Sequence, residues 1–124
     1  MGENKEYISN SNERGSINIS EEVISVIAGA AATEIEGVFG LYASSGRDFS
    51  EIVGKKQMSK GIKISAEDGR VTVELMLLVR MGYSVSEIGK AVQKAVAEAI
   101  EAAAGVTVEA VNVHICGISL IKDK

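Results

Sequence analysis

Several kinds of residue that often stabilise a small protein are scarce in this chain. Its 124 residues include no tryptophan, and aromatic residues make up only 4%, so a hydrophobic core must come from Val, Ile, Leu, Ala and Met. There is one cysteine, Cys116, which excludes an internal disulfide and is typical of a protein in a reducing cytoplasm. Length and composition together indicate one globular domain.

Long apolar runs are also lacking. No stretch approaches the roughly 20 apolar residues that a membrane-spanning helix needs. The polar start MGENKEYISNSNERG has no apolar segment of the kind found in a signal peptide. We therefore expect a cytoplasmic protein that reaches a membrane only through a partner.

Positive charge is in deficit, with a net charge of −4 and a pI of about 5.0. This balance argues against a general nucleic-acid binder, which needs a basic footprint. One local exception is a cluster of lysines at 55, 56, 60 and 63. It could contact an anionic partner, nucleic acid or lipid headgroups, or be an ordinary solvated loop. The second interpretation is favoured because no aromatic residues are interleaved with Lys55, Lys56, Lys60 and Lys63.

Helix signals stand out in two places. Ser20 is a predicted N-cap followed by two glutamates, and Gly37 is a plausible stop. Ser84 and Glu87 fit a capping box, and Gly105 ends the second helix. These signals predict helices over residues 21–36 and 85–104, with Val23, Ile27, Ala30 and Ala31 facing inward from the first.

Alternating apolar residues predict strands between and around these helices. We expect strands near 15–19, 38–43, 61–65, 71–81 and 109–119, a long loop over 44–60, a disordered tail over 1–14, one domain over 15–121 and a short polar end over 122–124. The order β-α-β-β-β-α-β predicts an α+β two-layer sandwich, with a mixed, mostly antiparallel sheet and two helices on one face.

The strand over 71–81 has an unusual outer face. Every second residue from Val71 to Met81 is apolar, and we expect these residues to face inward. On the opposite side Met76 and Leu78 are apolar where contact with water would be expected. Either loop 44–60 covers them or they mark self-association, and the sequence leaves both alternatives open.

The only histidine and the only cysteine, His114 and Cys116, lie two residues apart in the last predicted strand. Both point away from the core, about 6.5–7 Å apart at strand rise. A structural zinc site would need four ligands, and a cysteine nucleophile would need an orienting group and an oxyanion site as well as a base. Neither constellation accompanies the pair, and no phosphate-binding glycine loop is present. We therefore assign no catalytic, metal or cofactor-binding residues and expect no enzyme.

Four stretches, taken in order, resemble one known family. They are GSINISEEVISVIAGAAATEIEGVFGL, KKQMSKGIKI, VTVELMLLVRMGYSVSEIGKAVQKAV and VNVHICGI. Their motifs I-S-x-E-V-I, E-G-V, S-K-G and V-N-V-H-I-x-G-I are similar to those of the alkaline shock proteins, the Gls-type general stress proteins of Gram-positive bacteria. The resemblance covers roughly residues 15–120.

This resemblance implies a small, cytoplasmic, non-enzymatic protein that self-associates. Some members gather at the membrane through a small integral membrane anchor protein and support the cell envelope under stress. Others are linked to control of acetyl-CoA carboxylase, so subunits of that enzyme are the alternative partners. The family has no established catalytic residues, so none are carried over. Our candidate interaction residues are Met76, Leu78, Lys55, Lys56, Lys60 and Lys63.

Overall fold

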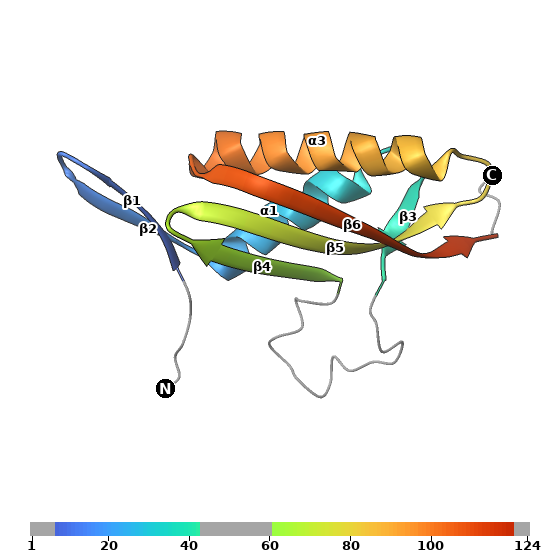
Figure 1. Ribbon diagram of the computed structural model, residues 1–124, viewed down its shortest axis with the longest axis horizontal. Helices are drawn as coiled ribbons and strands as arrows, with labels where there is room; N and C mark the ends of the chain where they lie inside the picture. Colours follow the sequence, from blue (N-terminus) through green and yellow to red (C-terminus); the bar gives the residue numbers. More distant parts are fainter. Residues whose placement is uncertain (1–6, 43–60, 121–124) are drawn as a thin grey trace, which may run out of the picture.

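The computed structural model describes residues 7–42 and 61–120 of the chain. They form an α+β structure in which two helices lie against one face of a sheet, as predicted (Figure 1). The elements are β1 (Tyr7–Asn12), β2 (Gly15–Ser20), α1 (Glu21–Thr33), β3 (Val38–Leu41), β4 (Ile62–Glu67), β5 (Arg70–Arg80), α3 (Val85–Ala104) and β6 (Thr107–Ser119).

Strand β5 is the centre of the main sheet. On one side it pairs antiparallel with β4 along its first half and with β3 along its second half. On the other side it pairs parallel with β6 over its whole length. The mixed, mostly antiparallel sheet that the sequence predicts is therefore confirmed, and β3 and β4 lie end to end along the same side of β5.

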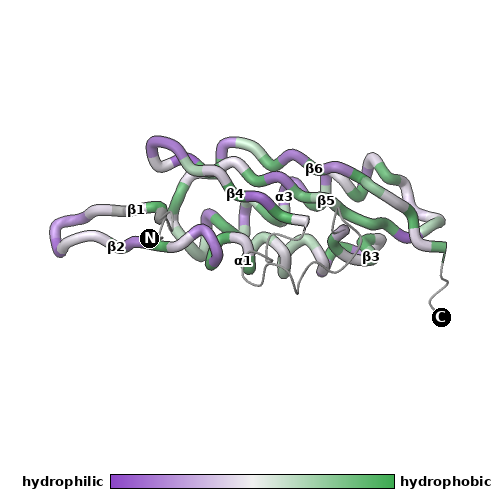
Figure 2. Tube along the Cα trace, turned by 90° about the horizontal axis from the view of Figure 1, so that it is seen from below, coloured by the Kyte–Doolittle hydropathy of each residue, from purple (hydrophilic) through white to green (hydrophobic). Residues whose placement is uncertain are grey.

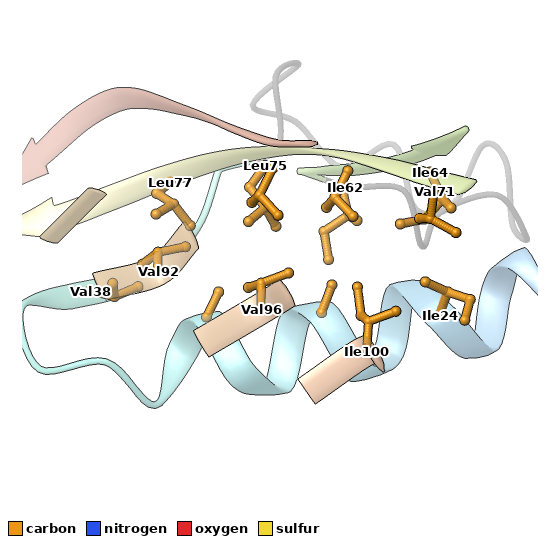
Figure 3. Packing of buried hydrophobic residues seen from close by; sticks show 14 of the residues in the cluster. Ile24, Val38, Ile62, Ile64, Val71, Leu75, Leu77, Val92, Val96 and Ile100 are labelled. Carbon is orange, nitrogen blue, oxygen red and sulfur yellow. The ribbon is translucent and has the colours of Figure 1, made fainter. Parts of the chain in front are cut away.

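The core lies between this sheet and the two helices (Figure 3). Strand β5 sends every second side chain inward, and α3 contributes an apolar stripe at four-residue spacing. Helix α1 has little side-chain bulk, which lets it pack against both α3 and the strands. The fully buried core side chains include Ile24, Val71, Val73, Leu75, Leu77, Val79, Val92, Val96 and Ile100.

Helix α1 differs from the sequence prediction in its inward face and in its end. Its buried face includes Ile24, Ala28 and Ala32, whereas Val23 is 47% exposed. Several faces of this helix are apolar, so periodicity alone did not decide which one meets the sheet. The helix ends at Thr33, and Gly37, with φ of 101°, instead shapes the turn into β3.

The predicted disordered tail is wrong for residues 7–14. Strand β1 pairs antiparallel with β2, and the Asn12 side chain accepts a hydrogen bond from the Arg14 backbone N–H in the turn. Asn and Ser disfavour strands, which is why composition predicted disorder here. Burial of Ile8 and partial burial of Ile19 at the base of the hairpin anchor it, while its tip projects away from the main sheet (Figure 1).

Candidate functional site

The face of the main sheet turned away from both helices is the surface on which the candidate residues gather. Within residues 7–42 and 61–120, both helices pack on the other face (Figures 1 and 3). We call this surface the open face. It carries Phe39, Lys63, Thr72, Glu74, Met76, Leu78, Arg80, Asn112 and His114.

The half of the open face beside β3 is largely apolar. Met76 and Leu78 are half-buried, and Phe39 is exposed with the Arg80 guanidinium 5.2 Å from its ring centroid. Leu78 lies over Gly117 of β6, so close that a Cβ at Gly117 would be 2.8 Å from a Leu78 methyl carbon. The absence of a Cβ at Gly117 therefore gives the Leu78 side chain room to pack against β6.

The half of the open face beside β4 is polar and is organised around Glu74. His114 Nε2 lies 3.0 Å from Glu74 Oε1, and the Asn112 amide donates to Glu74 Oε2 at 3.3 Å. The hydrogen bond to His114 is the main cause that lowers the pKa of the Glu74 carboxyl, and Asn112 and the nearby charge of Lys63 act in the same direction. The cluster is an exposed hydrogen-bonded group that links β5 to β6.

The spacing of His114 and Cys116 thus has a structural explanation. The imidazole is engaged by Glu74, and the Cys116 thiol contacts the backbone carbonyl of His114 at 3.7 Å. Among the residues that the structure describes, no group of three or more His, Cys, Asp or Glu side chains is placed to hold a metal ion. The sequence placed Asn112 and His114 on the correct face but missed Glu74, because only the parallel register of β5 and β6 brings Glu74 opposite Asn112 and within reach of His114. Cys116 falls where this register shifts, between Ile115 and Gly117.

A pH-dependent contribution to stability follows from this cluster. Because the folded-state pKa of Glu74 is lowered, its contribution is present above the unfolded-state pKa and is lost as pH falls through the folded-state pKa. We expect Glu74→Gln to destabilise the protein at neutral pH and to have a smaller effect in acid. Chemical denaturation of both proteins across this range measures the difference.

The matched control is Glu109→Gln, at an exposed glutamate of β6. It should show no comparable change between neutral and acid pH. The native protein and Glu74→Gln should differ in their free energy of unfolding at neutral pH. If this difference stays constant down to strongly acid pH, the expected role of the carboxylate is wrong.

The lysine cluster is only partly placed by the structure. Lys63 is exposed on β4 and lies near Glu74 on the open face. Lys55, Lys56 and Lys60 lie outside the described residues, so their role as an interaction surface stays a prediction.

Tyr42 and Gly61, the described residues on either side of the segment 43–60, both hydrogen-bond to the backbone of Met76. The Tyr42 N–H donates to the Met76 carbonyl, and the Met76 N–H donates to the Gly61 carbonyl, each at 2.8 Å. The segment itself lies outside the described residues. The two alternatives for the Met76 and Leu78 surface, cover by this segment or association with another chain, therefore both remain predictions.

Comparisons with known proteins identify relatives over most of the chain. The model of the alkaline shock protein family, described as having a "cell envelope-related function", matches residues 9–120. The uncharacterized protein YqhY of Bacillus subtilis (strain 168) is 31% identical over 84% of this chain and 77% of its own length. The uncharacterized protein Spy1614 of Streptococcus pyogenes serotype M6 is 30% identical over 86% of this chain and 90% of its own length.

Structural similarity is weaker. A variant of the MamM CTD covers 78% of this chain and 94% of its own at 13% identity, with a TM-score of 0.49. A likeness of this size carries no argument about function. Within the described part of the chain, no helix combines the length and apolar character needed to cross a membrane.

Proposed function

Because the chain belongs to the alkaline shock protein family, whose function is related to the cell envelope, we propose that it is a non-enzymatic, self-associating protein that acts by binding a protein partner. The resemblance found in the sequence and the family match agree on the cell envelope. We further propose that it takes part in the stress response, associates with itself and is brought to the membrane by a partner.

This proposal rests on the observation that the described helices cover only one face of the sheet. Helices α1 and α3 lie on one face, while no described element covers the other. A one-sided antiparallel sheet normally has a polar outer face. Here Met76, Leu78 and Phe39 form an apolar area beside the polar Glu74 cluster, and an exposed apolar area with a polar rim is typical of a protein–protein contact.

The chemistry of the described residues fits binding better than catalysis. The imidazole of His114 is engaged by Glu74, and the Cys116 thiol contacts a backbone carbonyl. Neither arrangement provides an activated nucleophile next to its base. The cluster can instead offer a carboxylate, an amide and an imidazole as hydrogen-bonding groups at the rim of a contact.

A crosslinked pull-down of the tagged protein from its native host tests the proposal. We expect recovery of untagged copies of the chain together with an integral membrane protein. Recovery of biotin-containing carboxylase subunits instead would favour control of acetyl-CoA carboxylase. If neither other copies nor a specific partner is crosslinked, the proposed function is wrong.

The open face has its own test within this experiment. Met76→Glu places a charge within the apolar area, so we expect partner recovery to fall about tenfold or more, as for a residue buried in an interface. Val26→Glu is the matched control because Val26 is 65% exposed on α1, on the helical side of the molecule. Equal recovery with both variants would show that the partner does not bind the open face.

A further inference from the structure

The open face has side chains of opposite character on neighbouring strands. On β5, Glu74, Met76 and Leu78 follow one another at every second position. The antiparallel register sets Lys63 of β4 beside Glu74 and Gly40 of β3 beside Leu78. Because β3 and β4 lie end to end along the same side of β5, these neighbours form one line of residues parallel to β5 (Figure 2).

The positions beside the two apolar side chains of β5 have no side chain of their own. Gly61 lies beside Met76 and accepts a hydrogen bond from its N–H, and Gly40 lies beside Leu78. A Cβ at Gly40 would have no described atom within 4 Å, because Leu78 packs towards Gly117 on the other side of β5. Half-buried apolar side chains therefore stand next to bare backbone, over which another side chain can lie.

The charged residues of the two lines are also matched in sign. Lys63 is exposed beside Glu74, and further along the same strands Glu67 is in register with Arg70. Among the described residues, no ion pair joins Lys63 to Glu74 or Glu67 to Arg70. Each line thus carries both signs, in the opposite order to the line beside it, and a surface with this order is complementary to a copy of itself.

We propose that the open faces of two copies of the chain pack against each other around a two-fold axis. The axis runs along the strands, midway between β5 and the line formed by β3 and β4. Rotation about it exchanges the two lines and keeps the position of each residue along them. A residue of β5 then lies opposite its own in-register neighbour in the second copy. The proposal rests on the self-association part of the proposed function and assigns the open face to it.

This arrangement brings complementary groups together near its centre. Met76 and Leu78 of one copy lie over Gly61 and Gly40 of the second, so their apolar surface leaves water where there is room for it. Glu74 lies over Lys63 of the second copy, and each contact occurs twice because the axis is two-fold. Packed sheets lie about 10 Å apart with their strands within about 30° of each other, so the alignment is closest around Met76.

The contact has a defined extent along β5. Towards the turn between β4 and β5, Arg70 comes to the side of Glu67 of the second copy, so like charges do not face each other there. At the other end, the Arg80 guanidinium lies over the Phe39 ring, and β5 ends. Met81, which the sequence predicted to face inward, follows the end of the strand, is 62% exposed and lies outside the contact.

A second copy suits this face better than a peptide of one charge sign. The Lys63 and Glu74 charges of two copies sum to zero, and each meets its opposite across the contact. A wholly basic or wholly acidic partner would place a like charge against one of the two, which is costly at an interface. The Met76 and Leu78 side chains likewise find the bare positions that they need on a second copy.

Charge reversal in the full chain tests the contact. Lys63→Glu sets two carboxylates against each other at two places, and Glu74→Lys does the same with two ammonium groups. We expect each variant alone to have a dimer dissociation constant about tenfold or more above that of the native protein. A one-to-one mixture of the two should dimerise again, because each variant carries the charge that the other needs. Light scattering and sedimentation measure the mean mass, and circular dichroism confirms folding.

Lys94→Glu and Glu98→Lys are the matched controls. These residues form an exposed ion pair on α3 at 3.3 Å, so the same two charge changes are made on the helical side of the molecule. Both controls and their mixture should associate as the native protein does. If the controls lose association alone and regain it when mixed, net charge and not the open face drives association, and the proposal is overturned.

Gly40→Leu tests the apolar part of the contact without any change of charge. The position is open and does not have a positive φ, so the variant should fold. Its side chain takes the space proposed for Leu78 of the second copy, and we expect the dissociation constant to rise about tenfold or more. Gly89→Leu, at an equally open position on α3, is the control and should change it little.

The outcomes separate this proposal from the proposed function. A native protein that stays monomeric at high concentration overturns both the contact and self-association. Association that survives Gly40→Leu and both charge reversals overturns the open-face contact alone. If Gly40→Leu lowers the free energy of unfolding and leaves association unchanged, the segment 43–60 of the same chain occupies this space. If it removes a membrane protein from the pull-down but keeps other copies, a different partner does. Either result overturns the proposal.

Discussion

Replacement of Ile100 by alanine is expected to lower the free energy of unfolding by about 2–5 kcal/mol, as for other large-to-small changes in a packed core. Ile100 is fully buried on α3 and reaches into the layer between the sheet and α1 (Figure 3). The neighbouring side chains come from different elements, so they cannot close the cavity by moving together. Urea denaturation followed by far-ultraviolet circular dichroism measures the change.

The control for this prediction is Ile17→Ala. Ile17 is an exposed isoleucine of the projecting hairpin, so the same change should cost less than about 1 kcal/mol. Similar losses at both positions would mean that the hairpin contributes to the core as much as α3 does, contrary to the observed burial.

Gly61→Ala should have an effect of similar size for a different reason. Gly61 has φ of 84°, and its Cβ would lie 3.0 Å from Leu41 Cβ, 3.1 Å from the Tyr42 carbonyl oxygen and 3.3 Å from that of Met76. These atoms are backbone oxygens or a Cβ, so a side-chain rotation cannot move them away. We expect a loss of about 2–5 kcal/mol, with about 1–2 from the left-handed backbone and about 1–3 from overpacking.

Gly69→Ala separates these two causes. Gly69, in the turn between β4 and β5, has φ of 79°, but nothing lies within 4 Å of its Cβ position. Its replacement should cost only the roughly 1–2 kcal/mol of the backbone conformation. Equal losses at Gly61 and Gly69 in thermal or urea denaturation would show that the crowding at Met76 relaxes without cost.

The Gly61 result also bears on the open face. Gly61, Tyr42 and Met76 join β3, β4 and β5 at one point, where the apolar half of the open face begins. If the variant folds but binds its partner less well than Gly69→Ala, the position of Met76 matters for the contact. If both bind equally, the contact depends on the outer side chains alone.

Local patterns were enough to predict the regular elements that belong to the main body. The capping residues Ser20 and Ser84 accept hydrogen bonds from the backbone three residues on, as expected. Alternation along 71–81 identified the buried side of β5, and Gly105 ends α3 with φ of 73°. These features depend on neighbours within a few residues, which is why the sequence alone predicts them.

The sequence by itself therefore determined the α+β class, the two helix starts, the central strand and the family resemblance. The tertiary structure decided which apolar side of α1 meets the sheet, that residues 7–12 pair as a strand, and that Glu74 meets Asn112 and His114. Each of these depends on the register or length of elements far apart in the chain, and short-range periodicity carries no information about such contacts.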